Sequence, residues 1–171
     1  MRAQFEAAMM PHLDAAHNLA HWLLANPQEA EDAVQDAYVR AMTYFGSFHA
    51  TDGRAWLLAI VRNSCYARLR QKRRHSELLD PAIELELAPD SRPDPEALHL
   101  KNADRLRVRQ GIEALPAEFR EVLVLREMEE LSYRQIARVI DAPIGTVMSR
   151  LARARRRLQE ILAPESRKET V

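Results

Sequence analysis

The stretch "LSYRQIARVIDAPIGTVMSRLARARRR", residues 131–157, contains two amphipathic segments separated by a short turn. Ser132 and Gln135 have the spacing of a capping box, which marks the start of the first helix. Pro143 interrupts that helix because its ring and its missing amide hydrogen cannot continue it. We therefore predict a helix from Ser132, a four-residue turn and a second helix that begins near Gly145.

The second of these helices has an apolar face and a basic face. Its apolar residues recur at helical spacing and predict a buried side: Val147, Leu151, Ala154, Leu158 and Ile161. Its remaining surface carries hydroxyl and arginine side chains: Thr146, Ser149, Arg150, Arg153 and Arg156. No acid occurs between Asp141 and Glu160, whereas a solvated helix normally includes glutamates as i, i+4 partners of its bases.

A helix that follows a short turn and exposes basic and hydroxyl side chains has the geometry of a major-groove reader. Its N-terminus offers unpaired amide hydrogens to phosphate oxygens. Arginine can also make paired hydrogen bonds to the major-groove edge of guanine. The sequence thus predicts a helix-turn-helix that binds duplex DNA.

The composition of the whole chain favours helices. Of 171 residues, 47% are hydrophobic, 6% are aromatic and only 4 are glycine, so the predicted fold class is all-α. The longest apolar run, residues 55–61, is too short to cross a bilayer, and the N-terminus lacks the pattern of a secretory signal. The single cysteine, Cys65, cannot form an internal disulfide. These features predict a cytoplasmic protein without membrane insertion.

The formal net charge of +0 hides a strong segregation of charge along the chain. Residues 1–53 hold two bases and seven acids, residues 54–76 hold seven bases and no acid, and residues 77–97 hold one base and seven acids. Two acid-free basic blocks, the second of them on the helix described above, are therefore separated by an acidic spacer. Such blocks favour binding to a polyanion, because the polyanion releases its condensed counterions when basic side chains bind it.

The acidic spacer also contains four prolines and is predicted to be a linker. We expect two small helical domains at residues 1–76 and 98–163, a linker at residues 77–97 and a tail at residues 164–171.

The first domain is predicted to contain two long helices. In "NPQEAEDAVQDAYVRAMTYF", Asn26 can cap the helix, Pro27 suits its first position and Glu29 has the spacing of a capping box. Its outer face is polar and acidic, and periodicity alone leaves open whether that face is merely solvated or docks a protein.

The second helix of this domain, "RAWLLAIVRNSCYARLRQKRR", places bases and the polar residues Asn63 and Ser64, both expected to be exposed, beside Trp56 and Tyr66. Bases and aromatic rings together can bind unpaired nucleotides, although a tryptophan taken singly more often packs in a core.

The order of these parts resembles a bacterial RNA polymerase sigma factor of the extracytoplasmic-function type, in the sigma-70 family, over residues 10–75 and 101–162. "AEDAVQDAYVRA" is similar to the region 2.1 to 2.2 helix that docks on the β′ clamp helices of core RNA polymerase. The resemblance implies this docking role for Asp32, Gln35 and Asp36. "AWLLAIVRN" is similar to regions 2.3 to 2.4, which open and read the −10 element. The residues implied there are Arg54, Trp56, Arg62 and Asn63.

"LPAEFREVLVLREMEELSYRQIA" and "APIGTVMSRLARARRRL" are similar to region 4, which reads the −35 element and meets the polymerase β flap. The implied DNA-binding residues are Thr146, Met148, Ser149, Arg150, Arg153, Arg155 and Arg156. Three positions depart from the usual pattern: Met148 stands where many members have a base, Ala67 replaces a frequent aspartate and Glu130 a frequent glycine.

The resemblance also implies three further features: promoter DNA as a partner, an anti-sigma factor as a regulator, and a linker whose carboxylates enter polymerase channels. A free-standing helix-turn-helix regulator and a sigma-like decoy that binds only a regulator remain alternatives. No glycine-rich phosphate loop, nucleophile with a base, or cluster of metal carboxylates is found, so we expect no catalytic residue, cofactor or metal. His17 and His21 share a helix face but lack further ligands nearby.

Overall fold

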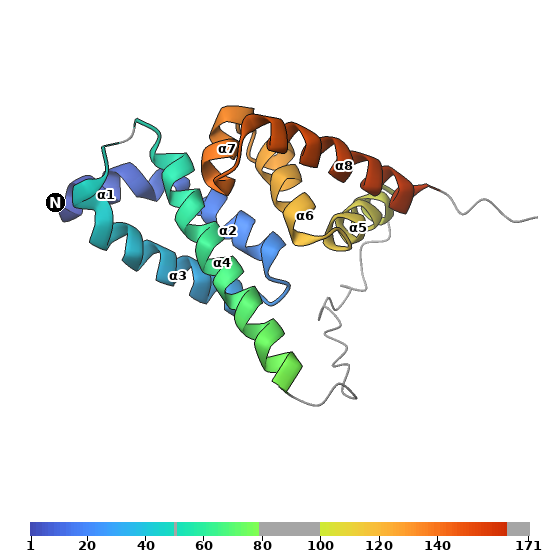
Figure 1. Cartoon of the computed structure of the whole chain (residues 1–171), viewed down its shortest axis with the longest axis horizontal. Coiled ribbons are helices and arrows are strands. Elements are labelled where there is room, and N and C mark those ends of the chain that lie inside the picture. The colour runs from blue at the N-terminus through green and yellow to red at the C-terminus, as the bar shows by residue number, and fades with distance from the viewer. Residues whose placement is uncertain (50, 79–99, 164–171) are drawn as a thin grey trace, which may run out of the picture.

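The computed structural model describes residues 1–49, 51–78 and 100–163, with side chains from residue 102 onward in the last range. Within these ranges every regular element is helical, which confirms the predicted all-α fold (Figure 1). The elements are α1 (Arg2–Met9), η1 (Met10–His12), α2 (Leu13–Leu23), α3 (Pro27–Tyr44), η2 (Phe45–Ser47), α4 (Gly53–Leu78), α5 (Leu100–Glu113), α6 (Ala117–Leu123), η3 (Val124–Met128), α7 (Tyr133–Ile140) and α8 (Ile144–Leu162).

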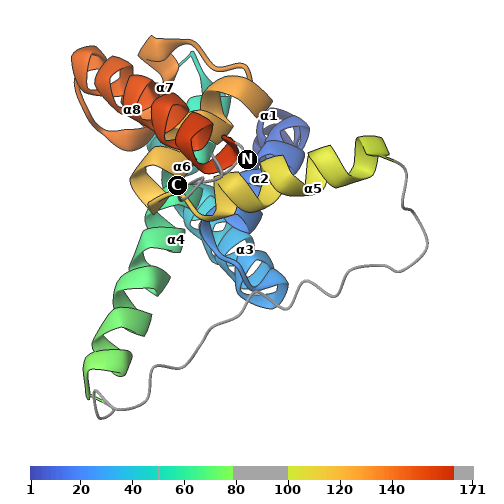
Figure 2. The ribbon, with the colours of Figure 1, turned by 90° about the vertical axis from the view of Figure 1, so that its right-hand side faces the viewer.

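The helices form two lobes, which we call the N-terminal lobe (α1–α4) and the C-terminal lobe (α5–α8). The far end of α4 projects away from the other helices in two perpendicular views (Figures 1 and 2). Most of the predicted linker and the whole predicted tail lie outside the described residues, so the domain boundaries remain a prediction. No helix in the described part of the chain is long and apolar enough to span a membrane.

In the N-terminal lobe, α3 begins where the sequence predicted. The Asn26 side chain accepts hydrogen bonds from the amides of Gln28 and Glu29, which caps the helix. Glu29 does not reach back as a capping box requires. Instead its carboxylate pairs with Lys72 of α4 at 2.6 Å and fastens the two helices together.

The other end of this lobe is closed by aromatic rings. Phe5 of α1 meets Tyr38 and Phe45 edge to face, with ring centroids 4.8 and 5.2 Å apart. Phe48 lies between Phe45 and Trp56, its ring centroid 4.7 Å from that of Trp56. These contacts hold the start of α4 against the ends of α1 and α3.

In the C-terminal lobe, the predicted helix-turn-helix is present. Ser132 and Gln135 form a complete capping box at the start of α7. Asp141 then adopts the left-handed conformation, with φ 51°, and ends the helix. Gly111 of α5 faces α8, where a Cβ atom would lie 2.9 Å from the end of the Leu158 side chain, so a larger residue there would require Leu158 to move.

Two side chains differ from the expectation. Ser64 is buried rather than exposed, because α4 is covered on a wider arc than its apolar stripe suggested. Ile161 is exposed, since α8 runs past the core before it ends at Leu162.

Glu130 has φ 54°, in the left-handed region that favours glycine. That conformation gives a physical reason why glycine is frequent at this position in the family that the sequence resembles.

Replacing Ser132 with alanine is expected to destabilise the protein by about 1 kcal/mol, because the Gln135 amide loses its cap. Urea unfolding followed by circular dichroism measures this change. Ser132→Asp provides the control, since an aspartate oxygen can cap in the same way and should preserve most of the stability. An alanine variant as stable as the parent would contradict the role of the cap.

Candidate nucleic-acid interface

The basic face of α8 is only partly free. Arg153, Arg156 and Arg157 are exposed, whereas Arg155 pairs with Glu127 at 2.6 Å and Arg150 is half-buried. The hydrogen bond with Glu127 raises the pKa of Arg155. Five arginines that look equivalent in sequence thus differ in their surroundings: within the described part of the chain, Arg150 and Arg155 have carboxylate partners, whereas no ion pair is seen for the other three.

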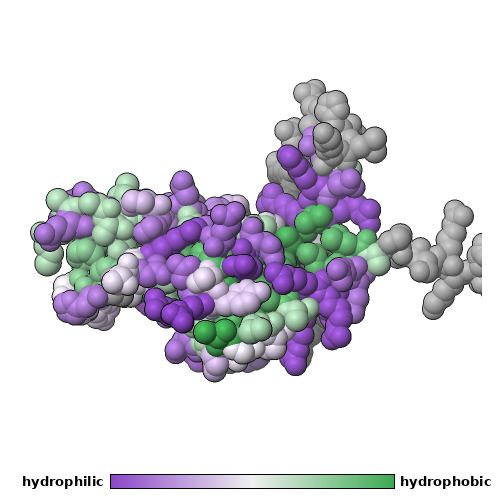
Figure 3. Space-filling view, turned by 90° about the horizontal axis from the view of Figure 1, so that it is seen from above, coloured by the Kyte–Doolittle hydropathy of each residue, from purple (hydrophilic) through white to green (hydrophobic). Residues whose placement is uncertain are grey.

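The start of α8 carries the smaller side chains of the predicted DNA-binding set. Thr146 is half-buried and Ser149 is exposed, with its hydroxyl donating to the Thr146 carbonyl at 3.0 Å. Met148 is 53% exposed, so an apolar side chain stands among the polar ones. From the side where Figure 1 places α7 and α8, hydrophilic side chains cover the middle of the surface, and apolar side chains gather in patches toward its two ends (Figure 3).

Several bases of the basic block of α4 pair with carboxylates. Within residues 1–49, 51–78 and 100–163 these pairs are Arg54 with Glu129, Arg62 with Glu121, Arg68 with Asp36 and Lys72 with Glu29. Arg70, Arg73 and Arg74 are exposed on the projecting end of the helix. Asn63 is exposed near the middle of α4, and Trp56 is half-buried against Phe48.

Arg62 is the most constrained of the predicted nucleotide-binding residues. Its Nε and Nη2 donate to the two carboxylate oxygens of Glu121, at 2.6 and 3.0 Å. Its guanidinium also lies 4.4 Å from the centroid of the Tyr66 ring. Burial raises the pKa of Glu121, although Arg62 opposes that shift, and burial raises the pKa of Tyr66.

The acidic face of α3 provides the predicted polymerase-docking residues. Asp32 accepts a hydrogen bond from Gln28 at 3.2 Å, and Gln35 is exposed. Asp36 is turned toward Arg68 of α4. A cavity of about 440 Å³ adjoins this face and is lined by Met10, Leu13, His17, Glu31, Val34, Gln35, Tyr38 and Val39.

Direct polar contacts join the two lobes. Glu129 of the C-terminal lobe accepts hydrogen bonds from Arg54 and from Asn18, both at 2.6 Å. Gln135 donates to Asp52 at 2.9 Å, and Arg120 donates to the carbonyl of Trp22 at 2.8 Å. The acids Glu121 and Glu129 were not singled out from the sequence.

A signal for Glu121 was nevertheless present. It stands next to Val122 and one helical turn before Leu125, both buried, so periodicity turns its carboxylate inward. A charge on an inward face requires a partner, which the sequence could not identify.

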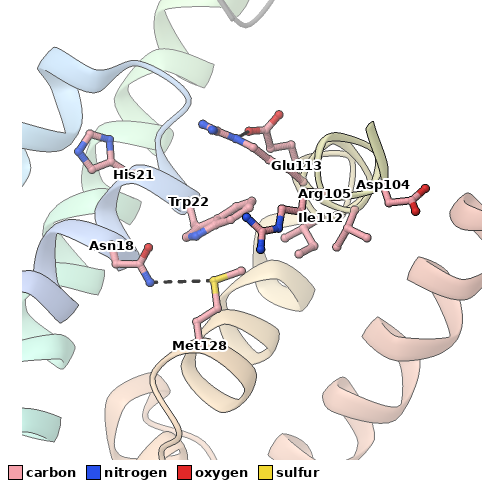
Figure 4. Close-up of a pocket in the computed structure, with 10 residues that line it drawn as sticks. Asn18, His21, Trp22, Asp104, Arg105, Ile112, Glu113 and Met128 are labelled. Atoms are coloured by element: carbon pink, nitrogen blue, oxygen red, sulfur yellow. Dashed lines mark hydrogen bonds and ion pairs between the residues drawn. The ribbon is translucent and has the colours of Figure 1, made fainter. Parts of the chain in front are cut away.

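A cavity of about 590 Å³ lies beside the contact between the lobes (Figure 4). Asn18, His21 and Trp22 of α2 line one side of it. Arg105, Val108 and Ile112 of α5 and Met128 of η3 are among the residues on the other side.

The structure also places Cys65 and His17, which the sequence raised as a possible reactive thiol and a possible metal ligand. Cys65 is fully buried, and burial raises the pKa of its thiol to about 12, so it is an inert core residue. His17 lies 3.4 Å from a Glu31 carboxylate oxygen. No group of three or more metal-ligating side chains occurs among the described residues.

Both lobes match family models of the same protein family. The family model described as sigma-70 region 2 matches residues 9–75, and that described as sigma-70, region 4, matches residues 105–158. The chain is 34% identical over 144 residues to the RNA polymerase sigma-H factor of Pseudomonas aeruginosa. This alignment covers 80% of the chain and 75% of that protein.

The chain is also 29% identical over 155 residues to the ECF RNA polymerase sigma factor SigE of Mycolicibacterium smegmatis. This alignment covers 91% of the chain but only 60% of that relative's length. Among solved structures, the sigma factor RpoE in complex with the anti-sigma factor NepR, from Bartonella quintana, is similar with a TM-score of 0.76 and 30% identity. The match covers 93% of this chain and 96% of that one.

Proposed function

The chain belongs to the extracytoplasmic-function group of the sigma-70 family, the sigma factors that direct transcription initiation, and from this premise we propose how its surfaces divide that work. The acidic face of α3 docks core RNA polymerase on the β′ clamp helices. The middle of α4 holds the opened −10 strand, and α8 reads the −35 duplex while the C-terminal lobe meets the β flap. The observation that carries this division is one acidic and two basic helical surfaces on a single chain.

The two basic surfaces suit different forms of DNA. In α4, Trp56 and Asn63 accompany the bases, and an aromatic ring with polar partners can hold unstacked nucleotides. In α8, exposed arginines follow a short turn, which suits the major groove of an intact duplex. Polymerase would fix the spacing between the lobes, so the second contact becomes intramolecular once the first has formed.

The remaining assignments follow from the same premise. We propose a cytoplasmic location and a role without catalysis of its own, in which the polymerase performs the chemistry. We also propose an anti-sigma factor as a regulator, supported by the similar RpoE structure, which was solved with its anti-sigma factor bound.

Transcription by a reconstituted enzyme tests the proposal. The purified chain is added to core polymerase on a genomic template library, and transcript starts are mapped. We expect a set of starts preceded by shared −35 and −10 elements. Starts no more frequent than with core polymerase alone would refute the function.

Replacing Asp32 and Gln35 together with alanine is expected to weaken core polymerase binding about tenfold or more, because interface anchors typically contribute over 1 kcal/mol each. Fluorescence anisotropy of the labelled chain with core polymerase measures the affinity. Glu6→Ala is the control, since it removes a partly exposed acid from α1 that pairs with Arg2, outside the proposed face. Equal affinities for the double variant and the control would contradict docking through α3.

A further inference from the structure

Exposed apolar side chains form a ridge along the start of α8. Ile144, Met148 and Ala152 follow one another at i, i+4 spacing, so they lie on one face of the helix. Ile144 is 43% exposed, Met148 is 53% exposed, and Ala152 is exposed as well. The core of the lobe uses a different face of α8, on which Val147 and Leu151 are buried. Packing within the lobe thus leaves most of this apolar ridge to solvent.

The polar side chains at the same end of α8 are largely engaged. Arg150 is the only base in residues 144–152, and it is half-buried with its guanidinium toward a buried carboxylate of α6. The Ser149 hydroxyl donates to the Thr146 carbonyl at 3.0 Å, so it can only accept a hydrogen bond from a ligand. The N-terminal residues of a recognition helix are the ones that meet base edges. The long, exposed side chain at this end is Met148, which is apolar.

One base edge in the major groove has an apolar group, which is the methyl group of thymine. We propose that Met148, supported by the apolar ridge, reads the methyl group of a thymine in the −35 element and so selects thymine at that position. The inference rests on the proposed reading of duplex DNA by α8, and it adds which base one part of the helix prefers.

The charge of the rest of α8 favours DNA over a protein as the occupant of the ridge. Arg153, Arg156 and Arg157 are exposed along the second half of the helix, and no acid occurs between Asp141 and Glu160. A duplex offers phosphates to these arginines and thymine methyl groups to the ridge at the same time. An apolar protein surface would cover the ridge and leave the arginines without opposite charge.

The local shape of the helix allows a base edge to come close to Met148. Gly145 lies one turn earlier and is exposed, and a Cβ atom built there would meet nothing within 4 Å. The unbranched thioether chain of methionine adapts to an irregular apolar contact. Burial of one methyl group against it corresponds to about fourfold in affinity.

Removal of single methyl groups from the DNA tests the inference without polymerase. The full chain selects its preferred duplex from a library with a randomised centre, at low salt, where phosphate contacts are strongest. Each thymine of that duplex is then replaced by uracil, which lacks the methyl group but pairs in the same way. We expect one thymine at which uracil weakens binding about fourfold, as measured by fluorescence anisotropy. A library with no enriched sequence, an enriched sequence without thymine, or uracil without effect would overturn the inference.

Variants of the chain show whether Met148 is the partner of that methyl group. In Met148→Ala the same uracil replacement should have no effect, because the two changes remove the same contact. Met148→Leu keeps an apolar side chain and should keep the sensitivity to uracil. Met128→Ala is the matched control, since Met128 is a 40% exposed methionine on η3, and it should respond as the parent does. Equal uracil effects in Met148→Ala and Met128→Ala would remove Met148 from the reading of thymine.

A change of preference provides a second measurement. Selection is repeated with Met148→Arg, whose guanidinium can make paired hydrogen bonds to guanine. We expect guanine to replace thymine at the position that the uracil series identifies. Retention of thymine there would contradict the inference, because the side chain at residue 148 would then not choose the base.

Binding to core polymerase tests a protein as the competing occupant. Met148→Ala and Met128→Ala should bind core polymerase equally well, because the ridge contacts DNA. A loss of affinity confined to Met148→Ala, together with no uracil effect, would assign the ridge to a protein contact and overturn the inference.

The proposed function fails separately from this inference. If the chain starts no transcript with core polymerase, the sigma function is refuted, whereas the uracil series on the selected duplex still decides whether Met148 reads thymine. If transcripts start normally and the uracil series shows no effect, only the role of Met148 is refuted.

Discussion

Replacing Arg153 and Arg156 together with alanine is expected to weaken binding of the −35 duplex by about 2 to 6 kcal/mol, which is roughly 30-fold or more. Both side chains are exposed on α8, and neither forms an ion pair within the part of the chain that the structure describes. Because they are free, DNA does not have to displace an internal partner. Holoenzyme binding to a labelled promoter fragment found by start mapping measures the loss.

The same measurement separates base reading from phosphate binding. If the arginines read bases, substitutions in the −35 element should cost the parent about 1 to 3 kcal/mol and the double variant much less. If they contact only phosphates, the salt dependence should fall while sequence preference stays unchanged. Arg109→Ala is the control for loss of a positive charge outside α8, since Arg109 is exposed on α5 and pairs with Glu113. A double variant that binds as well as this control would rule out α8 as the reading surface.

Leu151→Ala is expected to destabilise the protein by about 2 to 5 kcal/mol, because it removes a leucine side chain from a closely packed core. Leu151 is 1% exposed, on the face of α8 that packs against α6 and α7. The substitution leaves a cavity beneath the helix that carries Arg153 and Arg156.

The midpoint of urea unfolding measures the effect of Leu151→Ala. Leu106→Ala is the matched control, since Leu106 is 47% exposed on α5 and its truncation should change stability by about 0.5 kcal/mol or less. Similar midpoints for the two variants would show that α8 is not anchored through Leu151.

The sequence was sufficient for the features that depend on near neighbours. The cap at Asn26, the capping box at Ser132 and the end of α7 at Asp141 follow from residues within one helical turn of each other. Most of the buried faces followed from periodicity, because each helix must turn an apolar stripe toward a core, although Ile161 is exposed and Ser64 is buried. The family resemblance followed from motifs that are likewise contiguous stretches of sequence.

In the candidate site, too, the sequence predicted what depends on near neighbours and could not predict contacts between distant residues. Periodicity placed Arg153 and Arg156 on the surface of α8, and they are exposed. It could not distinguish them from Arg155, which Glu127 engages, because that partner lies 28 residues earlier in the chain. The DNA-contacting and polymerase-docking roles themselves remain predictions.

The sequence by itself determined the helices, their caps and the order of acidic and basic surfaces, since these depend on spacings of a few residues. Only the tertiary structure decided which bases are free and which are held. Arg62 meets Glu121 across 59 residues of sequence, and Arg54 meets Glu129 across 75. Such pairs form because packing the lobes brings opposite charges into a space that water has left, and no local pattern records which carboxylate will be there.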